Sequence, residues 1–105
     1  MSEKRYNRDQ IETIILQTIM ARPYKEFGGN KIYFVNAIGE EAVIKGLAGT
    51  KEITSLYELE QAVNEPEIQN IYIGKNASVT SKGLKSVLER SSLTKDIFCS
   101  FEVKD

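Results

Sequence analysis

One group of acid and base side chains with the residue types of a catalytic centre is Glu40, Glu41 and Lys45, around the turn between two predicted strands. Carboxylates beside a lysine could form part of a metal-dependent nuclease centre. However, Glu41 and Lys45 are four residues apart, and no aspartate lies near them in sequence to complete the oxygen-rich ligand set of a divalent cation. We therefore interpret these charges as a solvated turn and edge strand, where charge discourages pairing with other strands.

Histidine is absent from the 105 residues, and Cys99 is the one cysteine. Ser-His and Cys-His nucleophiles and His-bearing zinc sites cannot be built without histidine. A single cysteine excludes an intramolecular disulfide and favours a reducing, cytoplasmic compartment. The sequence therefore predicts a protein that is not an enzyme, with no catalytic residues, no cofactor and no metal.

One stretch has the residue types of a nucleic-acid-binding element. Ile71-Tyr72-Ile73-Gly74-Lys75-Asn76, followed by a helical pattern, resembles the first strand and helix of the RNA-recognition motif family, in which a strand aromatic stacks on a base. The resemblance covers about 20 residues and implies that Tyr72 is the stacking residue. An alternative function is therefore a module for single-stranded nucleic acid that uses strand aromatics and the basic third helix, namely Tyr33, Tyr72, Lys75, Lys82 and Lys85.

Two aromatics, Tyr24 and Phe27, lie in a loop beside the flexible pair Gly28-Gly29 and could either pack over the core or contact a partner. The charges are also unevenly distributed. Residues 40–67 hold seven acidic and two basic side chains, whereas residues 75–95 hold five basic and one acidic. Such a dipolar surface could steer a charged partner. The expected partner-binding residues are therefore Tyr24, Phe27, Glu58, Glu60, Lys82 and Lys85.

These residues must be positioned by alternating helices and strands. Apolar spacing predicts a first helix over residues 7–22, with Asn7 and Gln10 forming a capping box and Pro23 ending it. Capping residues Ser55 and Thr80 predict the starts of two more helices. Strands are expected at residues 31–38, 41–47, 68–74 and 97–103, the first two as a hairpin across Gly39-Glu40 and the last with one wetter face.

The resulting order is α-β-β-α-β-α-β in a single α+β domain spanning residues 1–105, of which residues 1–6 form a flexible N-terminus. We expect a four-stranded mixed sheet, built from the hairpin and β-α-β units and packed with three helices. Strand 31–38 should be central in the sheet, since its apolar run does not alternate. A second copy of the chain could cover an open face of the sheet, so a homodimer is also expected.

The formal net charge of −1 gives no general attraction for nucleic acid or anionic membranes, and no apolar run is long enough to span a bilayer. The expected function is a small non-catalytic protein-binding module, such as an adaptor, inhibitor or regulatory subunit, that associates with another protein, with itself, or with both.

Overall fold

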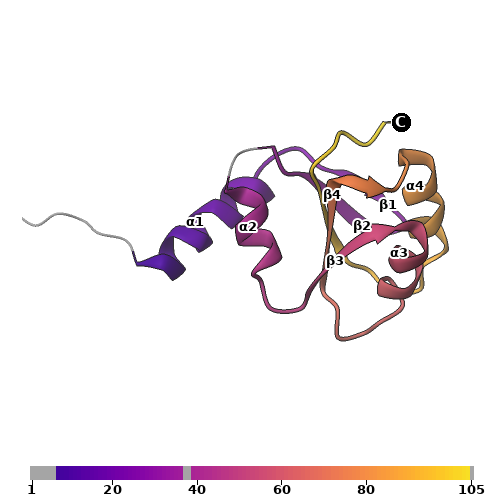
Figure 1. Ribbon diagram of the computed structural model, residues 1–105, viewed down its shortest axis with the longest axis horizontal. Coiled ribbons are helices and arrows are strands. Elements are labelled where there is room, and N and C mark those ends of the chain that lie inside the picture. Colours follow the sequence, from indigo (N-terminus) through magenta and orange to yellow (C-terminus); the bar gives the residue numbers. More distant parts are fainter. Residues whose placement is uncertain (1–6, 37–38, 105) are drawn as a thin grey trace, which may run out of the picture.

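The computed structural model describes residues 7–36 and 39–104, and the predicted flexible N-terminus lies outside these residues. They form an α+β fold in which a mixed five-stranded sheet lies between two pairs of helices (Figure 1). The helices are α1 (Arg8–Met20), α2 (Glu40–Lys45), α3 (Leu56–Ala62) and α4 (Ser81–Arg90). The strands are β1 (Lys25–Phe27), β2 (Asn30–Phe34), β3 (Thr50–Ser55), β4 (Asn70–Ser78) and β5 (Asp96–Cys99).

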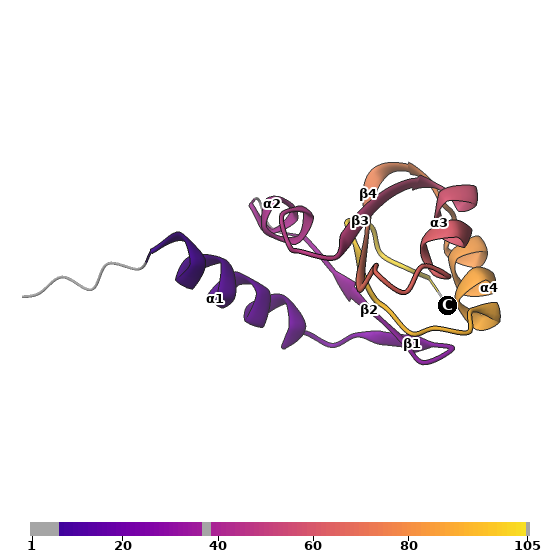
Figure 2. The same ribbon diagram turned by 90° about the horizontal axis from the view of Figure 1, so that it is seen from below.

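The strand order is β1-β2-β5-β4-β3, with β1 antiparallel to β2 and the other four strands parallel. From β2 the chain crosses the sheet to β3, and it then returns through β4 to β5. Connections between parallel strands are nearly always right-handed, so the two directions of travel place their helices on opposite faces. Accordingly, α2 lies on one side of the sheet and α3 and α4 on the other, while α1, which precedes the first strand, packs on the same side as α2 (Figure 2).

The three predicted helix starts are confirmed. In α1, the Asn7 carboxamide oxygen accepts from the Gln10 amide at 2.8 Å, and the Gln10 side chain accepts from the Asn7 amide at 2.9 Å. Ser55 and Thr80 cap α3 and α4 through the amides of Glu58 and Gly83. The fold class is therefore confirmed together with the local signals that set the helix ends.

The predicted hairpin between residues 31–38 and 41–47 is wrong. Gly39 has a φ of +93° and directs the chain into α2, so Glu40, Glu41 and Lys45 belong to a helix and not to a turn and edge strand. The hairpin of this fold is instead β1–β2. Its two-residue turn is Gly28-Gly29, with φ values of +58° and +82°, as tight hairpin turns require.

Three further details differ from expectation. The sheet has five strands rather than four and the described residues form four helices rather than three, because β1 and the polar edge strand β3 were not predicted and the segment predicted as a strand at 41–47 forms α2. Strand β2 was expected to be central, which is wrong: it is internal, and the central strand is β5. Both of its faces are therefore covered, and Phe98 and Ser100 are buried where a wetter face was expected.

No helix among the described residues is long and apolar enough to cross a membrane.

Candidate functional site

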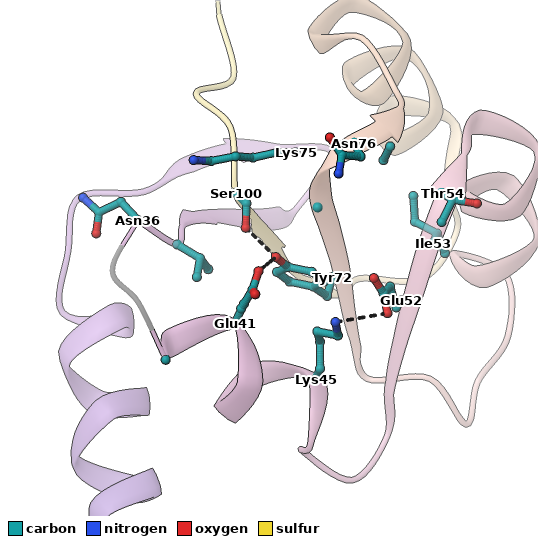
Figure 3. Close-up of a pocket in the computed structure, with 14 residues that line it drawn as sticks. Asn36, Glu41, Lys45, Glu52, Ile53, Thr54, Tyr72, Lys75, Asn76 and Ser100 are labelled. Atoms are coloured by element: carbon teal, nitrogen blue, oxygen red, sulfur yellow. Dashed lines mark hydrogen bonds and ion pairs between the residues drawn. The ribbon is translucent and has the colours of Figure 1, made fainter.

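A pocket of about 550 Å³ opens where the parallel strands end (Figure 3). Residues at or just beyond the carboxyl ends of β2, β5, β4 and β3 line it, and α2 closes one side. We call it the carboxyl-edge pocket. Open α/β sheets commonly bind ligands at the carboxyl ends of their strands, which makes this pocket the candidate small-ligand site.

An irregularity between β3 and β4 shapes the pocket wall. The pairs Ile53–Ile73 and Ser55–Ser78 enclose one residue of β3, Thr54, but residues 74–77 of β4. The longer strand must leave the regular ladder there. This bulge contributes Gly74, Lys75, Asn76 and Ala77 to the pocket lining.

Tyr72 forms the floor of the pocket. Its hydroxyl donates to the Glu41 carboxylate, with 2.9 Å between the Tyr72 oxygen and Oε2, and also shares a hydrogen bond with the Ser100 hydroxyl. Burial raises the pKa of Tyr72, and the neighbouring Glu41 carboxylate acts in the same direction, whereas the bond with Ser100 lowers it. The phenol is therefore protonated near neutral pH, and it acts as a donor that fixes Glu41 in place.

The charged side chains of the pocket differ in their pairing. Lys45 Nζ lies 3.6 Å from a Glu52 carboxylate oxygen and 5.9 Å from the centre of the Tyr72 ring. Glu41 and Lys75 meet no opposite charge within the described part of the chain. Nor do residues 7–36 and 39–104 contain a group of three or more carboxylate and cysteine side chains placed to hold a metal ion. The pocket thus presents one unpaired carboxylate and one unpaired ammonium group.

A second candidate surface is α1, whose N-terminal half extends away from the sheet (Figure 2). Ile11 and Ile14 are 47% and 46% exposed, and within α1 only Ile19 is fully buried. Ile11 and Ile14 belong to the same apolar stripe as Ile19, but no helix or strand among residues 7–36 and 39–104 covers the outer turns of α1.

The inner end of α1 is fixed by an ion pair. Arg22 Nη1 donates to Glu40 Oε1 at 2.8 Å and to the Phe34 carbonyl at 3.0 Å, while Nη2 pairs with Glu40 Oε2. Glu40 lies at the start of α2 and is buried. This two-pronged contact joins α1 to α2 and β2, so the exposed half of α1 projects from an anchored base.

The aromatics predicted to bind a partner lie on opposite faces of the sheet. The Tyr24 ring is 47% exposed and packs 5.5 Å from the Tyr33 ring on the α1 side. Phe27 packs against the core beneath α4, with Lys85 Nζ 5.0 Å from its ring centre. Each aromatic already contacts a lysine, because Lys31 Nζ lies 5.2 Å from the Tyr24 ring centre, but only Tyr24 keeps about half of its surface exposed.

The predicted steering charges lie on α3 and α4, across the sheet from α1. The Glu58 carboxylate accepts from the Thr54 amide at 3.0 Å and from its hydroxyl, and these bonds lower the pKa of Glu58. Glu60 pairs with Arg90 at 3.4 Å, while Lys82 is exposed. The structure therefore does not bring the six predicted partner-binding residues together into one surface.

The residues of the nucleic-acid alternative are also separated. Tyr33 and Tyr72 are 3% and 1% exposed, and the Tyr33 ring stacks on Phe98 at 5.3 Å. In this fold, neither ring has an exposed face on which a base could stack. Lys75 lies at the pocket, and Lys82 and Lys85 lie on α4.

Sequence reasoning did not identify Ser100, Gly74 or Asn36 as site residues. A sequence signal was available for Ser100. It directly follows the apolar run Ile97-Phe98-Cys99, at the carboxyl end of a strand, where ligand sites of α/β proteins often lie.

No protein-family model matches this sequence, and the searches of curated proteins and of solved structures found no similar chain.

Proposed function

We propose that this chain is a non-catalytic protein-binding module that places the exposed half of α1 into an apolar groove of a partner protein. The observation that carries the proposal is the half-exposed pair Ile11 and Ile14 on a helix that projects from the sheet.

The spacing on α1 suits this mode of recognition. A helix that binds in a groove uses anchors at positions i, i+3, i+4 and i+7. Here the exposed Ile11 and Ile14 occupy the first two positions, Ile15 at the third packs partly against the chain's own core, and Thr18 occupies the fourth. Covering the exposed half of each of Ile11 and Ile14 would contribute about 1 kcal/mol.

The size of the stripe favours a groove over a second α1 helix. A stable homodimer usually buries more than about 1,000 Å². Two turns of helix lying against the same two turns of a second copy fall short of that area, whereas a groove surrounds the helix and covers more of it. A second copy therefore becomes the partner only if it offers such a groove.

The chemistry of the described nucleophiles supports a binding role without catalysis. Burial raises the pKa of the Cys99 thiol to about 12, so its thiolate is scarce at neutral pH. The Tyr72 phenol also stays protonated, because burial raises its pKa. Since Lys45 is paired with Glu52, none of these groups is prepared for general base or nucleophilic chemistry.

Affinity capture from an extract of the source cells tests the proposal with three forms of the tagged chain. The forms are the wild type, the double variant Ile11→Glu/Ile14→Glu, and the control Tyr57→Glu. Tyr57 is 71% exposed on α3, so the control makes the same kind of change on a helix on the other side of the sheet.

The proposal predicts a stoichiometric protein that the wild type and Tyr57→Glu retain and the double variant loses. Sedimentation of the purified chain shows whether that protein is a second copy. Capture of the same proteins by all three forms, or loss in the control alone, would contradict the role of α1.

A further inference from the structure

We propose that the carboxyl-edge pocket binds a small zwitterion, namely an α-amino acid or a short peptide with a free amine and a free carboxylate. The structure places an unpaired Glu41 carboxylate and an unpaired Lys75 ammonium group in one pocket. This site is separate from the exposed half of α1 and does not rest on the function proposed for that helix.

The size and position of the pocket suit a small molecule. Its volume of about 550 Å³ lies within the range of about 300–1,000 Å³ that is usual for ligand sites. Its lining comes from the carboxyl ends of four parallel strands, which hold side chains in place better than a free loop does.

Glu41 is prepared to receive an amine. Only its Oε2 atom takes the hydrogen bond from Tyr72, so the carboxylate is oriented while its second oxygen is left for a ligand. The other carboxylate nearby, Glu52, is neutralised by Lys45 at 3.6 Å. A ligand ammonium group would therefore pair with Glu41 in a charge-assisted hydrogen bond.

Lys75 offers the complementary charge across the pocket (Figure 3). The side-chain amides of Asn76 and Asn36 also line the pocket, Asn76 beside Lys75 and Asn36 at the opposite edge (Figure 3), and neither makes a hydrogen bond to another described residue. Lys75 supplies an ammonium group for a carboxylate, and each amide offers a further donor. A ligand with a single sign of charge would meet one attractive and one repulsive partner, so the site discriminates in favour of a zwitterion.

Gly74 leaves the space that the ligand would occupy. A Cβ atom placed there would meet only the Tyr72 ring, at 3.6 Å from Cε2 and 3.8 Å from the hydroxyl oxygen. A side chain at position 74 would therefore enter the pocket without striking the backbone. This gives a steric probe of binding that leaves Glu41 and Lys75 intact.

The test is a titration of the isotope-labelled full chain followed by amide NMR, using each of the twenty common L-amino acids and glycylglycine at millimolar concentration. The proposal predicts that at least one of them shifts the amides of Gly74, Lys75, Asn76 and Ser100. The N-acetyl and methyl ester derivatives of that ligand, which each lack one charge, should bind about tenfold more weakly or worse.

Three variants and a control complete the test. Glu41→Gln and Lys75→Gln should each weaken binding about tenfold. Gly74→Leu should abolish it, and Ser78→Leu, which adds the same side chain to the same strand outside the pocket, should leave it unchanged. Should Gly74→Leu fail to fold, the two charge variants still decide the question.

Two results would overturn the inference. One is that no amino acid or glycylglycine shifts these amides at millimolar concentration. The other is that the derivatives lacking one charge bind the wild-type chain as tightly as the unmodified ligand does, or that the Glu41→Gln and Lys75→Gln variants bind that ligand as tightly as the wild type does. The α1 double variant Ile11→Glu/Ile14→Glu should keep zwitterion binding, so failure of one proposal does not imply failure of the other.

Discussion

The two faces of the sheet are covered by different types of side chain. The face beneath α3 and α4 is covered by a continuous cluster made up mainly of aliphatic side chains, including Ile71, Leu84, Leu88 and Ile97. The face beneath α1 and α2 has a smaller cluster, centred on the row Tyr33, Phe98 and Tyr72.

This difference places the main stabilising core on one face of the sheet and the candidate binding sites on the other. A buried aliphatic side chain needs no hydrogen-bond partner, whereas a buried tyrosine needs one for its hydroxyl group. That need brings Glu41 and Ser100 to Tyr72 and so builds polar groups into the floor of the pocket. The α3/α4 face therefore holds the fold together, while the α1/α2 face carries the pocket and the projecting helix.

The largest expected effect concerns Cys99, which is 1% exposed and belongs to the α3/α4 cluster. Burial raises the pKa of its thiol to about 12. Labelling by a thiol reagent at pH 8 should therefore require global unfolding and run at least about a thousandfold slower than in the urea-unfolded chain. Labelling at the unfolded rate would show that this face opens readily.

Truncation of a buried side chain on the α3/α4 face should give the next largest effect. Leu88 is fully buried, and Leu88→Ala should lower the free energy of unfolding by about 3 kcal/mol through lost burial and the cavity left behind. Urea unfolding followed by circular dichroism measures this change. The exposed neighbour Glu89 is the control, and Glu89→Ala should change stability by less than about 0.5 kcal/mol.

Truncation on the other face should act locally. Ile19→Ala removes the buried side chain of α1 and should cost about 2 kcal/mol, mainly by loosening α1 from α2 and β2. Amide hydrogen exchange should then accelerate along α1 while α4 keeps its protection. Equal acceleration of exchange in both helices would show that the two faces unfold as one unit and would contradict the distinction between them.

The smallest expected effect is a pH dependence at Asp96, which lies beside Lys31 in the register of β2 and β5. Burial raises the pKa of Asp96, and Lys31 offsets part of the rise. The folded chain therefore keeps this proton to a higher pH than the unfolded chain, so ionisation lowers stability as the pH rises through the folded pKa.

Asp96→Asn should remove this loss. The variant should be more stable than the wild type at pH 7 by a few tenths of a kcal/mol, roughly, because water screens the partly exposed carboxyl group. At pH 3 the two proteins should be equal in urea unfolding. A less stable variant at pH 7 would mean that attraction to Lys31 outweighs burial.

Sequence patterns identified the elements whose signals are local. The capping residues Asn7, Ser55 and Thr80 predicted three helix starts, because a cap needs only a few neighbouring residues. Strand β3 was missed because its central position, Ile53, is its one buried residue, and an edge strand needs few apolar residues. Helix α2 was misread because Ala42, Val43 and Ile44 resemble a short strand.

The candidate site could be predicted only in part. Glu41 and Lys45 were considered as part of a nuclease centre and Tyr72 and Lys75 as nucleic-acid contacts, and the fold brings the four together in one pocket. Their association depends on the order β2-β5-β4-β3, which no local pattern encodes. The exposure of Ile11 and Ile14 was equally hidden, since periodicity shows an apolar stripe but not what covers it.

The most direct test of the proposed function is site-specific photo-crosslinking in the source cells, with a photoreactive phenylalanine analogue at position 14 or, as the control, at position 57. Both positions are solvent-exposed on helices, on opposite sides of the sheet. The proposal predicts one discrete protein crosslinked from position 14 and none from position 57. No discrete crosslink from position 14, or the same products from both positions, would contradict binding through α1.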